Sequence, residues 1–411
     1  VYKRQGYNVI FYLAALQNIP KELLEAAQVD GAGAFRRFWK VTFPLLSPTT
    51  FFLLTMNMIY AFFETFPIVD IMTRGGPGDA TNVLIYNLYR DGFRFFKTGL
   101  ASAQSVVLFI FVVILTLIQL WKGGCTMAHR PVSSRRYRRL RRLKKIAIHL
   151  ALILSILVIA MPVLYAILGS TQTTGEAYRY PPKLTPGKAL IDNFRKAWNL
   201  GLGKMLGNTF LVATGVVIGK VILSILAGFA FVYFQFPGKD ILFFLVLITL
   251  MFPLEVRIVS LFEFFQKLKL GNTYYALVLP FMASATGTYL FRQHFKSIPK
   301  ELLDAARVDG AGPLRFLFQI LLPISWNTVG ALAAVMFVYA WNQYLWPLLI
   351  ITTKEKQMIQ VGLKMALQAE AGEIDWGMAM AATLLSIIPP LVVFFLLQER
   401  FMRGFALSRE K

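Results

Sequence analysis

Residues 206–234 read LGNTFLVATGVVIGKVILSILAGFAFVYF, and they decide the fold class of the chain. The only Asp, Glu, Lys or Arg in this stretch is Lys220. A helix needs about 20 mostly apolar residues to cross a bilayer, because each residue adds about 1.5 Å along the helix axis. The stretch is therefore predicted to cross a membrane as a helix.

Further apolar segments repeat this pattern along the chain: 47–71, 99–121, 146–170, 241–254, 273–291, 324–353 and 378–398. The first of these contains two acidic residues, Glu64 and Asp70, and segment 241–254 is short enough that we expect it to extend past Glu255 and Arg257. Residues 6–17 resemble the end of a ninth segment. Since only helices and closed barrels satisfy every backbone polar group in lipid, we predict an all-α polytopic membrane protein. It would have about eight complete transmembrane helices and a truncated one.

The composition of the 411 residues supports this prediction. Hydrophobic residues make up 56%, charged residues only 16%, and the mean hydropathy is +0.57. An ordinary soluble domain has roughly 25% charged residues, so a soluble enzyme is nearly excluded, as is an intrinsically disordered chain. The single cysteine, Cys125, excludes a disulfide framework and a cysteine-based metal cage.

The net charge of +22 is concentrated in one segment, residues 122–145, which holds ten Lys or Arg and no Asp or Glu. Basic runs can bind nucleic acid, but this one directly precedes an apolar segment. It is therefore interpreted as a cytoplasmic anchor on the anionic lipid of the bilayer, with no nucleic-acid partner. With this segment inside, the inner loops after residue 121 hold 20 Lys and Arg and the outer loops 11, as the positive-inside rule requires.

An internal repeat is the most specific feature of the sequence. The stretch PKELLEAAQVDGAG at 20–33 recurs as PKELLDAARVDGAG at 299–312, and 14 of 27 positions are identical between 20–46 and 299–325. Proline fits the first turn of a helix, and Gly31 and Gly310 stand where a C-terminal cap is expected. We predict a short helix, a glycine cap and a second short helix on the cytoplasmic side in each copy.

These repeats resemble the cytoplasmic EAA loop of permease subunits of ATP-binding-cassette (ABC) importers. Within that family the chain looks closest to the sn-glycerol-3-phosphate importer. This resemblance implies that the chain has the type I ABC importer permease fold. Residues 127–411 resemble a complete six-span permease with coupling loop 299–325. Residues 1–126 resemble the C-terminal part of its partner permease, with coupling loop 20–46. Residues 1–5 are expected to be foreign sequence, because Lys3 and Arg4 align with a span of the other copy.

In that family the EAA loop forms a coupling helix that docks in a cleft of the ATPase subunit. The positions that match the motif are Glu22, Glu25, Ala26, Ala27, Asp30 and Gly31, and Glu301, Asp304, Ala305, Ala306, Asp309 and Gly310. The resemblance implies a cytoplasmic ABC ATPase dimer, a periplasmic or extracellular solute-binding protein and a partner permease. It also implies a place in the bacterial plasma membrane.

The sequence offers no catalytic or metal site. It has no G-x-x-x-x-G-K-[ST] phosphate loop, so we expect a transport subunit rather than an enzyme, with ATP and Mg bound by the partner ATPase and no cofactor on this chain. The three histidines are scattered at positions 129, 149 and 294 and form neither a metal nor a catalytic cluster.

Polar residues inside apolar segments are the candidates for the substrate pathway, since such residues are costly in a membrane. They are Lys220, Glu255, Arg257, Asn342, Gln343, Tyr344, Asn57, Tyr60 and Glu64. Lys220 could contact an anionic substrate, or could form an ion pair with a carboxylate such as Glu64 or Glu255. The amides and tyrosines could line the pathway, or could form hydrogen bonds between helices.

The resemblance predicts an importer permease for sn-glycerol 3-phosphate. An importer for a neutral sugar or oligosaccharide is the main alternative, because it would use aromatic stacking and amides instead of buried cations. An ion-coupled secondary transporter also has repeats and membrane charges, but it has no need of two cytoplasmic docking helices.

Overall fold

The computed structural model describes residues 21–63, 65–123, 160–181, 183–249, 254–299, 301–367 and 374–405, with single positions at 8, 9, 11, 12, 15, 16, 19, 153 and 157. The described residues form helices and turns and contain no β-sheet. The predicted all-α fold class is confirmed. The chain divides into two compact units, residues 1–68 with 106–165, and residues 69–105 with 166–411. These units do not follow the predicted boundary between residues 126 and 127, which stays a prediction.

The first unit contains the first repeat. Its helices are α2 (Lys21–Val29), α3 (Ala34–Arg37), the π-helical turn η2 (Phe38–Thr42) and α4 (Phe43–Phe63). Helices α2, α3 and α4 all pack against η2 or against one another. The later part of α7 (Thr98–Gly123) joins this unit, where Phe111 contacts Phe62 edge-to-face at a ring-centroid distance of 5.5 Å.

The second unit begins with residues 69–105, which follow the first repeat in the sequence. This segment contains the π-helical turn η3 (Val69–Thr73), α6 (Leu84–Tyr89), the π-helical turn η4 (Arg90–Arg94) and the start of α7. Ile85, Tyr86 and Leu88 of α6 are almost completely buried. Helix α6 therefore packs this segment into the second unit, although other parts of the segment, such as Phe96, are exposed.

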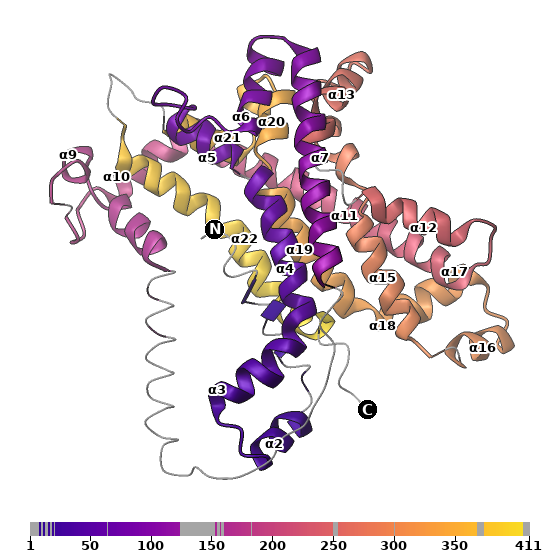
Figure 1. The fold of residues 1–411 in the computed structure, drawn as a ribbon. Coiled ribbons are helices and arrows are strands. Elements are labelled where there is room, and N and C mark those ends of the chain that lie inside the picture. The colour runs from indigo at the N-terminus through magenta and orange to yellow at the C-terminus, as the bar shows by residue number, and fades with distance from the viewer. Residues whose placement is uncertain are drawn as a thin grey trace. The chain divides into compact units, whose positions relative to one another are not determined.

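The remaining helices of the second unit are α9 (Thr174–Ala177), α10 (Leu190–Ala197), α11 (Gly203–Tyr233), α12 (Lys239–Ile248), α13 (Leu254–Lys267), α14 (Tyr274–Val278), α15 (Ala285–Ser297), α16 (Glu301–Val308), α17 (Pro313–Phe316), α18 (Leu322–Ile324), α19 (Trp326–Trp341), α20 (Leu345–Ile350), α21 (Ile359–Ala366) and α22 (Trp376–Phe405). Figure 1 shows α11, α15, α19 and α22, where α11 packs against α15 and α19, and α19 packs against α22. Helices α11, α15 and α19, together with the second repeat, enclose an apolar core that includes Phe229, Phe291 and Phe295.

Where the structure describes the predicted spans they contain helices, and some of these helices are broken. Two helices among the described residues are long and apolar enough to cross a bilayer, Leu190–Tyr233 and Trp376–Arg400. A third candidate is the pair Pro313–Ile324 and Trp326–Trp341, which is bent by 74°. The predicted count of eight complete spans and a truncated one stays a prediction.

Segment 273–291 is not the uninterrupted helix that its apolar composition suggested. Helix α14 ends at Val278, a short 3₁₀ turn follows, and α15 begins only at Ala285. Pro280 lacks a backbone N–H, and the Ser284 side chain accepts a hydrogen bond from the N–H of Gly287 and so starts a new helix. Hydropathy alone does not detect such a break, because the residues on both sides of it are apolar.

Candidate functional site

The two repeats fold into the same structure. A glycine with left-handed backbone lies two residues beyond the end of each of the helices α2 and α16, Gly31 (φ +78°) and Gly310 (φ +72°). In the first copy the N–H of Ala32 donates to the carbonyl of Ala27 at 3.0 Å, and in the second the N–H of Ala311 donates to the carbonyl of Ala306 at 2.8 Å. These bonds, with those from the two glycine N–H groups, form a Schellman cap. The predicted helix and glycine cap are confirmed in both copies.

Each repeat exposes both charged and large apolar side chains on its outer surface. Glu25, Ala26 and Gly31 are exposed in the first copy. The second copy exposes Glu301, Asp304, Ala305, Asp309 and Gly310. Large apolar side chains lie beside these residues, with Val308 88% and Phe35 78% exposed. An exposed apolar surface with a charged rim is the composition of a protein-binding site. The Glu22 side chain lies outside the described residues.

Each Ala-Ala pair divides its two residues between the outside and the inside. Ala305 is exposed, whereas Ala306 is 4% exposed and belongs to the core that also contains Phe295, Phe316 and Leu317. Ala26 and Ala27 of the first copy show the same division. The first alanine of each pair is therefore available to a partner, and the second holds the short helix against its own chain.

A buried hydrogen bond connects the two ends of the second repeat. His294 near the end of α15 and Ser325 at the bend before α19 lie 3.0 Å apart, from the His294 Nε2 to the Ser325 Oγ. The Ser325 hydroxyl also donates to the carbonyl of Leu321 at 2.6 Å. Because α16 lies between these residues in the chain, the bond ties the two ends of the second coupling loop together. At the offset of the repeat the first copy has Ala15 and Leu46 instead, so it lacks this bond.

Removing this hydrogen bond is expected to loosen the second coupling loop. Ser325→Ala leaves the buried His294 Nε2 without its partner, which costs about 1–3 kcal/mol. The melting temperature of the purified chain should fall. Ser297→Ala is the matched control, because the Ser297 hydroxyl bonds only to the carbonyl of His294 within its own helix. Equal melting temperatures for the two variants would contradict the role given to Ser325.

Lys220 is buried inside the second unit without an opposite charge among the described side chains. It is 7% exposed. Its Nζ lies 4.7 Å from the centre of the Tyr339 ring and 3.6 Å from the Met336 Sδ. No ion pair between described residues includes Lys220. A buried ammonium whose described contacts are a ring and a thioether is poorly compensated by them, since these contacts replace little of its hydration.

The predicted neighbours of Lys220 are described in part. Arg257 at the start of α13 is exposed, and its positive charge acts on Lys220, so two of the candidate cations share one region. Glu64 and the side chain of Glu255, the two suggested ion-pair partners, lie outside the described residues. The prediction of an ion pair with either of them stays untested.

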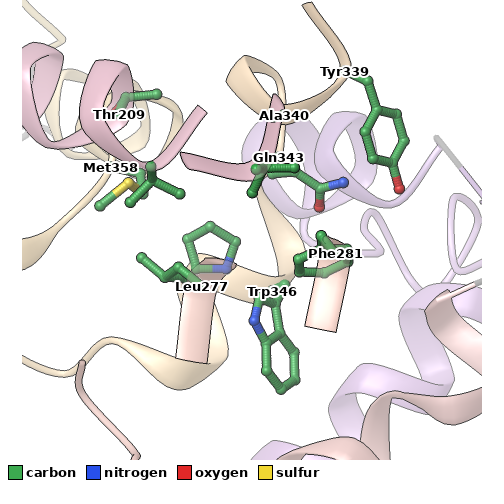
Figure 2. A pocket seen from close by; sticks show the side chains of 11 residues that line it. Thr209, Leu277, Phe281, Tyr339, Ala340, Gln343, Trp346 and Met358 are labelled. Atoms are coloured by element: carbon green, nitrogen blue, oxygen red, sulfur yellow. The ribbon is translucent and has the colours of Figure 1, made fainter. Parts of the chain in front are cut away.

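The second unit contains a hollow, and one of the residues that line it is Tyr339, the residue whose ring centre lies 4.7 Å from the Lys220 Nζ. The other lining residues are Thr209, Val212, Val216, Leu277, Phe281, Ala340, Gln343, Trp346, Pro347 and Met358. Figure 2 shows Trp346, Phe281 and Leu277 on one side and Thr209, Met358 and Gln343 facing them. The Trp346 ring is held by a hydrogen bond of 2.9 Å from its Nε1 to the carbonyl of Ala276.

Among the predicted polar residues whose side chains the structure describes, Gln343 is the one that lines the hollow. Asn342 is exposed and donates to the carbonyl of Val338, and Asn57 donates to the Oδ1 of Asn8. The Tyr60 side chain lies outside the described residues.

Tyr344 points elsewhere, to residues that the sequence did not single out as functional. Its hydroxyl donates to the Oδ2 of Asp70 at 2.6 Å, and the Nζ of Lys364 reaches the same oxygen. The signal for Asp70 was present in the sequence, as an acidic residue inside an apolar segment. Among the described residues, no group of three or more His, Cys, Asp or Glu is placed to hold a metal ion.

Comparison with known proteins identifies relatives across most of the chain. Residues 5–122 and 220–406 match the family described as binding-protein-dependent transport system inner membrane component. The sn-glycerol-3-phosphate transport system permease protein UgpE of Escherichia coli O1:K1 / APEC is 43% identical over 263 residues, which cover 62% of this chain and 94% of that protein. The protein of the same name from Brucella melitensis biotype 1 is 41% identical over 264 residues, with the same coverage of 62% and 94%.

A solved structure supports the same fold. The crystal structure of a bacterial ABC transporter involved in the import of the acidic polysaccharide alginate aligns with a TM-score of 0.58. The alignment covers 65% of this chain and 99% of that chain, at 21% sequence identity. At this identity the likeness concerns the fold, which is that of an ABC transporter permease. The predicted fold is therefore confirmed beyond its all-α class.

Proposed function

The chain belongs to the family of binding-protein-dependent transport system inner membrane components, and on this premise we propose that it conducts sn-glycerol 3-phosphate across the membrane. As a member of this family it is a permease component of an ABC importer and lies in the inner membrane. The family favours an importer over the ion-coupled transporter that the sequence had left as an alternative.

The partners follow from this proposal. A solute-binding protein delivers the substrate on the outer side, and an ATPase dimer with its ATP and Mg docks on the inner side. The exposed faces of α2 and α16 are the proposed docking surfaces, since the two copies share one cap geometry and expose matching residues. Residues 1–126 and 127–411 act as parts of two unlike permease units. Closure of the ATPase dimer then pushes on both coupling loops, and the helices alternate between outward and inward access.

The observation that carries the substrate class is the buried Lys220. A phosphate monoester brings negative charge and several acceptor oxygens, which an ammonium in a water-poor site binds through charge-assisted hydrogen bonds. Arg257 adds a second positive charge to the same region. Gln343 offers an amide to the glycerol hydroxyls from the wall of the hollow. The names of the two relatives agree with this substrate.

Uptake into vesicles tests the proposal. The full chain is reconstituted with its candidate ATPase and binding protein, and ATP-driven uptake of sn-glycerol 3-phosphate is compared with that of maltose. Lys220→Met keeps the length of the side chain and removes the charge. We expect it to lower phosphate-ester uptake about tenfold or more, because hydrogen bonds to charged groups contribute about 1.5–3 kcal/mol.

Lys204→Met is the matched control, because Lys204 lies on the same helix but is exposed. It should transport normally. If Lys220→Met also transports the phosphate ester at the normal rate, the anion contact is refuted and Lys220 has a structural role.

A neutral sugar is the second candidate substrate. The observation that favours it is the aromatic wall of the hollow, where the ring centroids of Phe281 and Trp346 lie 6.4 Å apart, together with the Gln343 amide. Such walls suit the apolar face and the hydroxyls of a sugar. Maltose uptake that is insensitive to Lys220→Met would support this alternative and would leave the importer assignment intact.

A further inference from the structure

A carboxylate in the segment after the first repeat is completely buried among residues that follow the second repeat. Asp70, in the π-helical turn η3, is 0% exposed. Its Oδ2 accepts a hydrogen bond from the Tyr344 hydroxyl at 2.6 Å and pairs with the Nζ of Lys364 at 2.5 Å. These partners lie 274 and 294 residues further along the chain. We call these three residues the Asp70 cluster.

The rest of the Asp70 environment is also positive. The Nη2 of Arg94 lies 3.8 Å from the Oδ1 of Asp70, and this oxygen has no hydrogen-bond partner among the described residues. Lys364 lies on α21, and its side chain is 16% exposed. Without Asp70, the ammonium of Lys364 would be largely buried with no opposite charge that the structure describes. The Asp70 carboxylate therefore compensates the charge of Lys364 at this place.

The cluster joins a whole segment to the second unit. Residues 69–105 belong to the same compact unit as 166–411. Besides the cluster, Phe93 of η4 contacts Phe262 of α13 edge-to-face at 5.5 Å. Residues 69–105 thus connect the first-copy part of the chain to the second unit. They bind there to the residues around Tyr344 and Lys364.

The two copies of the repeat contribute different residues to the Asp70 cluster. Past the coupling loops the two copies align through Phe66-Pro67 and Trp346-Pro347, an offset of 280. At this offset Ile350 stands in the second copy where the first has Asp70. Conversely, at an offset of 279 or 280 the first copy has no tyrosine in the place of Tyr344 and no lysine in the place of Lys364. Neither copy contains both halves of the cluster.

We propose that the Asp70 cluster determines which permease units pair, by admitting the first-type segment 69–105 to a second-type unit and disfavouring pairs of like units. Two second-type units would place Ile350 against Tyr344 and Lys364 and leave a buried ammonium uncompensated. Two first-type units would leave Asp70 without the tyrosine and the lysine that receive it. Removing one partner of a buried charge pair is strongly unfavourable, so each wrong pair is rejected. The inference rests on the two-unit organisation in the proposed function.

Retention of a cleaved fragment tests the pairing. A protease site is inserted after Met127 in the full chain, a tag is placed at the C-terminus, and the chain is cleaved after solubilisation. The measured quantity is the amount of N-terminal fragment that stays on the tagged fragment. Asp70→Ile imitates the like pair and should reduce this amount about tenfold or more. Adding Lys364→Met to Asp70→Ile removes the orphan charge and should restore most of it.

A second pair of variants serves as a control for folding. Asp70→Asn keeps the shape of the side chain and removes its charge, and should weaken retention. Asp79→Asn makes the same change in the exposed ion pair with Arg90 on the same segment, and should leave retention unchanged. The proposal is overturned if Asp70→Ile is retained like the unchanged chain, or if the double variant is no better than Asp70→Ile. Because no substrate enters this measurement, a failure of glycerol-3-phosphate uptake would contradict the proposed substrate and leave the pairing result standing.

Discussion

Replacing Gly310 by tryptophan is expected to abolish ATP-driven uptake while the chain still inserts into the membrane. Gly310 is exposed at the end of α16, and a Cβ at this position would meet no atom within 4 Å. The side chain therefore causes no clash inside the chain. The left-handed backbone (φ +72°) costs about 1–2 kcal/mol for a residue other than glycine, which is too little to prevent folding. The indole instead projects from the surface where we expect the ATPase to dock.

The chain provides a matched control for this substitution. Gly238 precedes α12 with φ +75°, and a Cβ there also meets no atom within 4 Å. Gly238→Trp thus introduces the same backbone strain and the same bulk in another loop. The measurements are membrane insertion, co-purification of the ATPase and ATP-driven uptake. We expect loss of the last two for Gly310→Trp only. Normal uptake by Gly310→Trp, or equal loss in both variants, would refute coupling through this helix end.

The features that sequence analysis predicted correctly depend on local interactions. The cap at Gly31 and Gly310 needs only the residues of one helix end, so the repeated motif was enough to predict it. The all-α class follows similarly from long apolar stretches such as 206–234, because a backbone in lipid has to satisfy its own hydrogen bonds. The breaks in segments 273–291 and 324–353 were missed, because hydropathy does not register a side-chain cap such as Ser284.

The contacts that sequence analysis missed are those between distant residues. Asp70 was visible as a charge in an apolar segment, but nothing in its neighbourhood pointed to Tyr344 or Lys364. Lys220 was correctly singled out as an unusual residue, and the partners suggested for it were carboxylates. The contacts that the structure describes are Met336 and Tyr339, which lie on α19, and the suggested carboxylates lie outside the described residues. A charge pattern identifies residues that need compensation, and tertiary packing decides what supplies it.

Replacing Ala305 or Ala306 of the second repeat by leucine is expected to have two different effects. One substitution should lower the stability of the chain, and the other should weaken its binding to the ATPase. Ala306→Leu adds bulk to a well-packed core beside Phe295 and Phe316, which costs about 1–3 kcal/mol. The melting temperature of the purified chain should fall, and α16 should be displaced from its own unit. Ala305→Leu adds the same bulk to the exposed side of the same helix. It should leave the melting temperature unchanged.

The exposed substitution should act on the partner instead. If the ATPase packs closely against α16, the added side chain costs about 1–3 kcal/mol of association, which is roughly tenfold or more in affinity. Co-purification of the ATPase then falls with Ala305→Leu at unchanged stability. Ala26→Leu and Ala27→Leu should repeat this contrast in the first copy, where Ala27 is the buried member. If Ala305→Leu binds the ATPase normally, this face of α16 does not dock, and coupling has to pass through the glycine end of the helix alone.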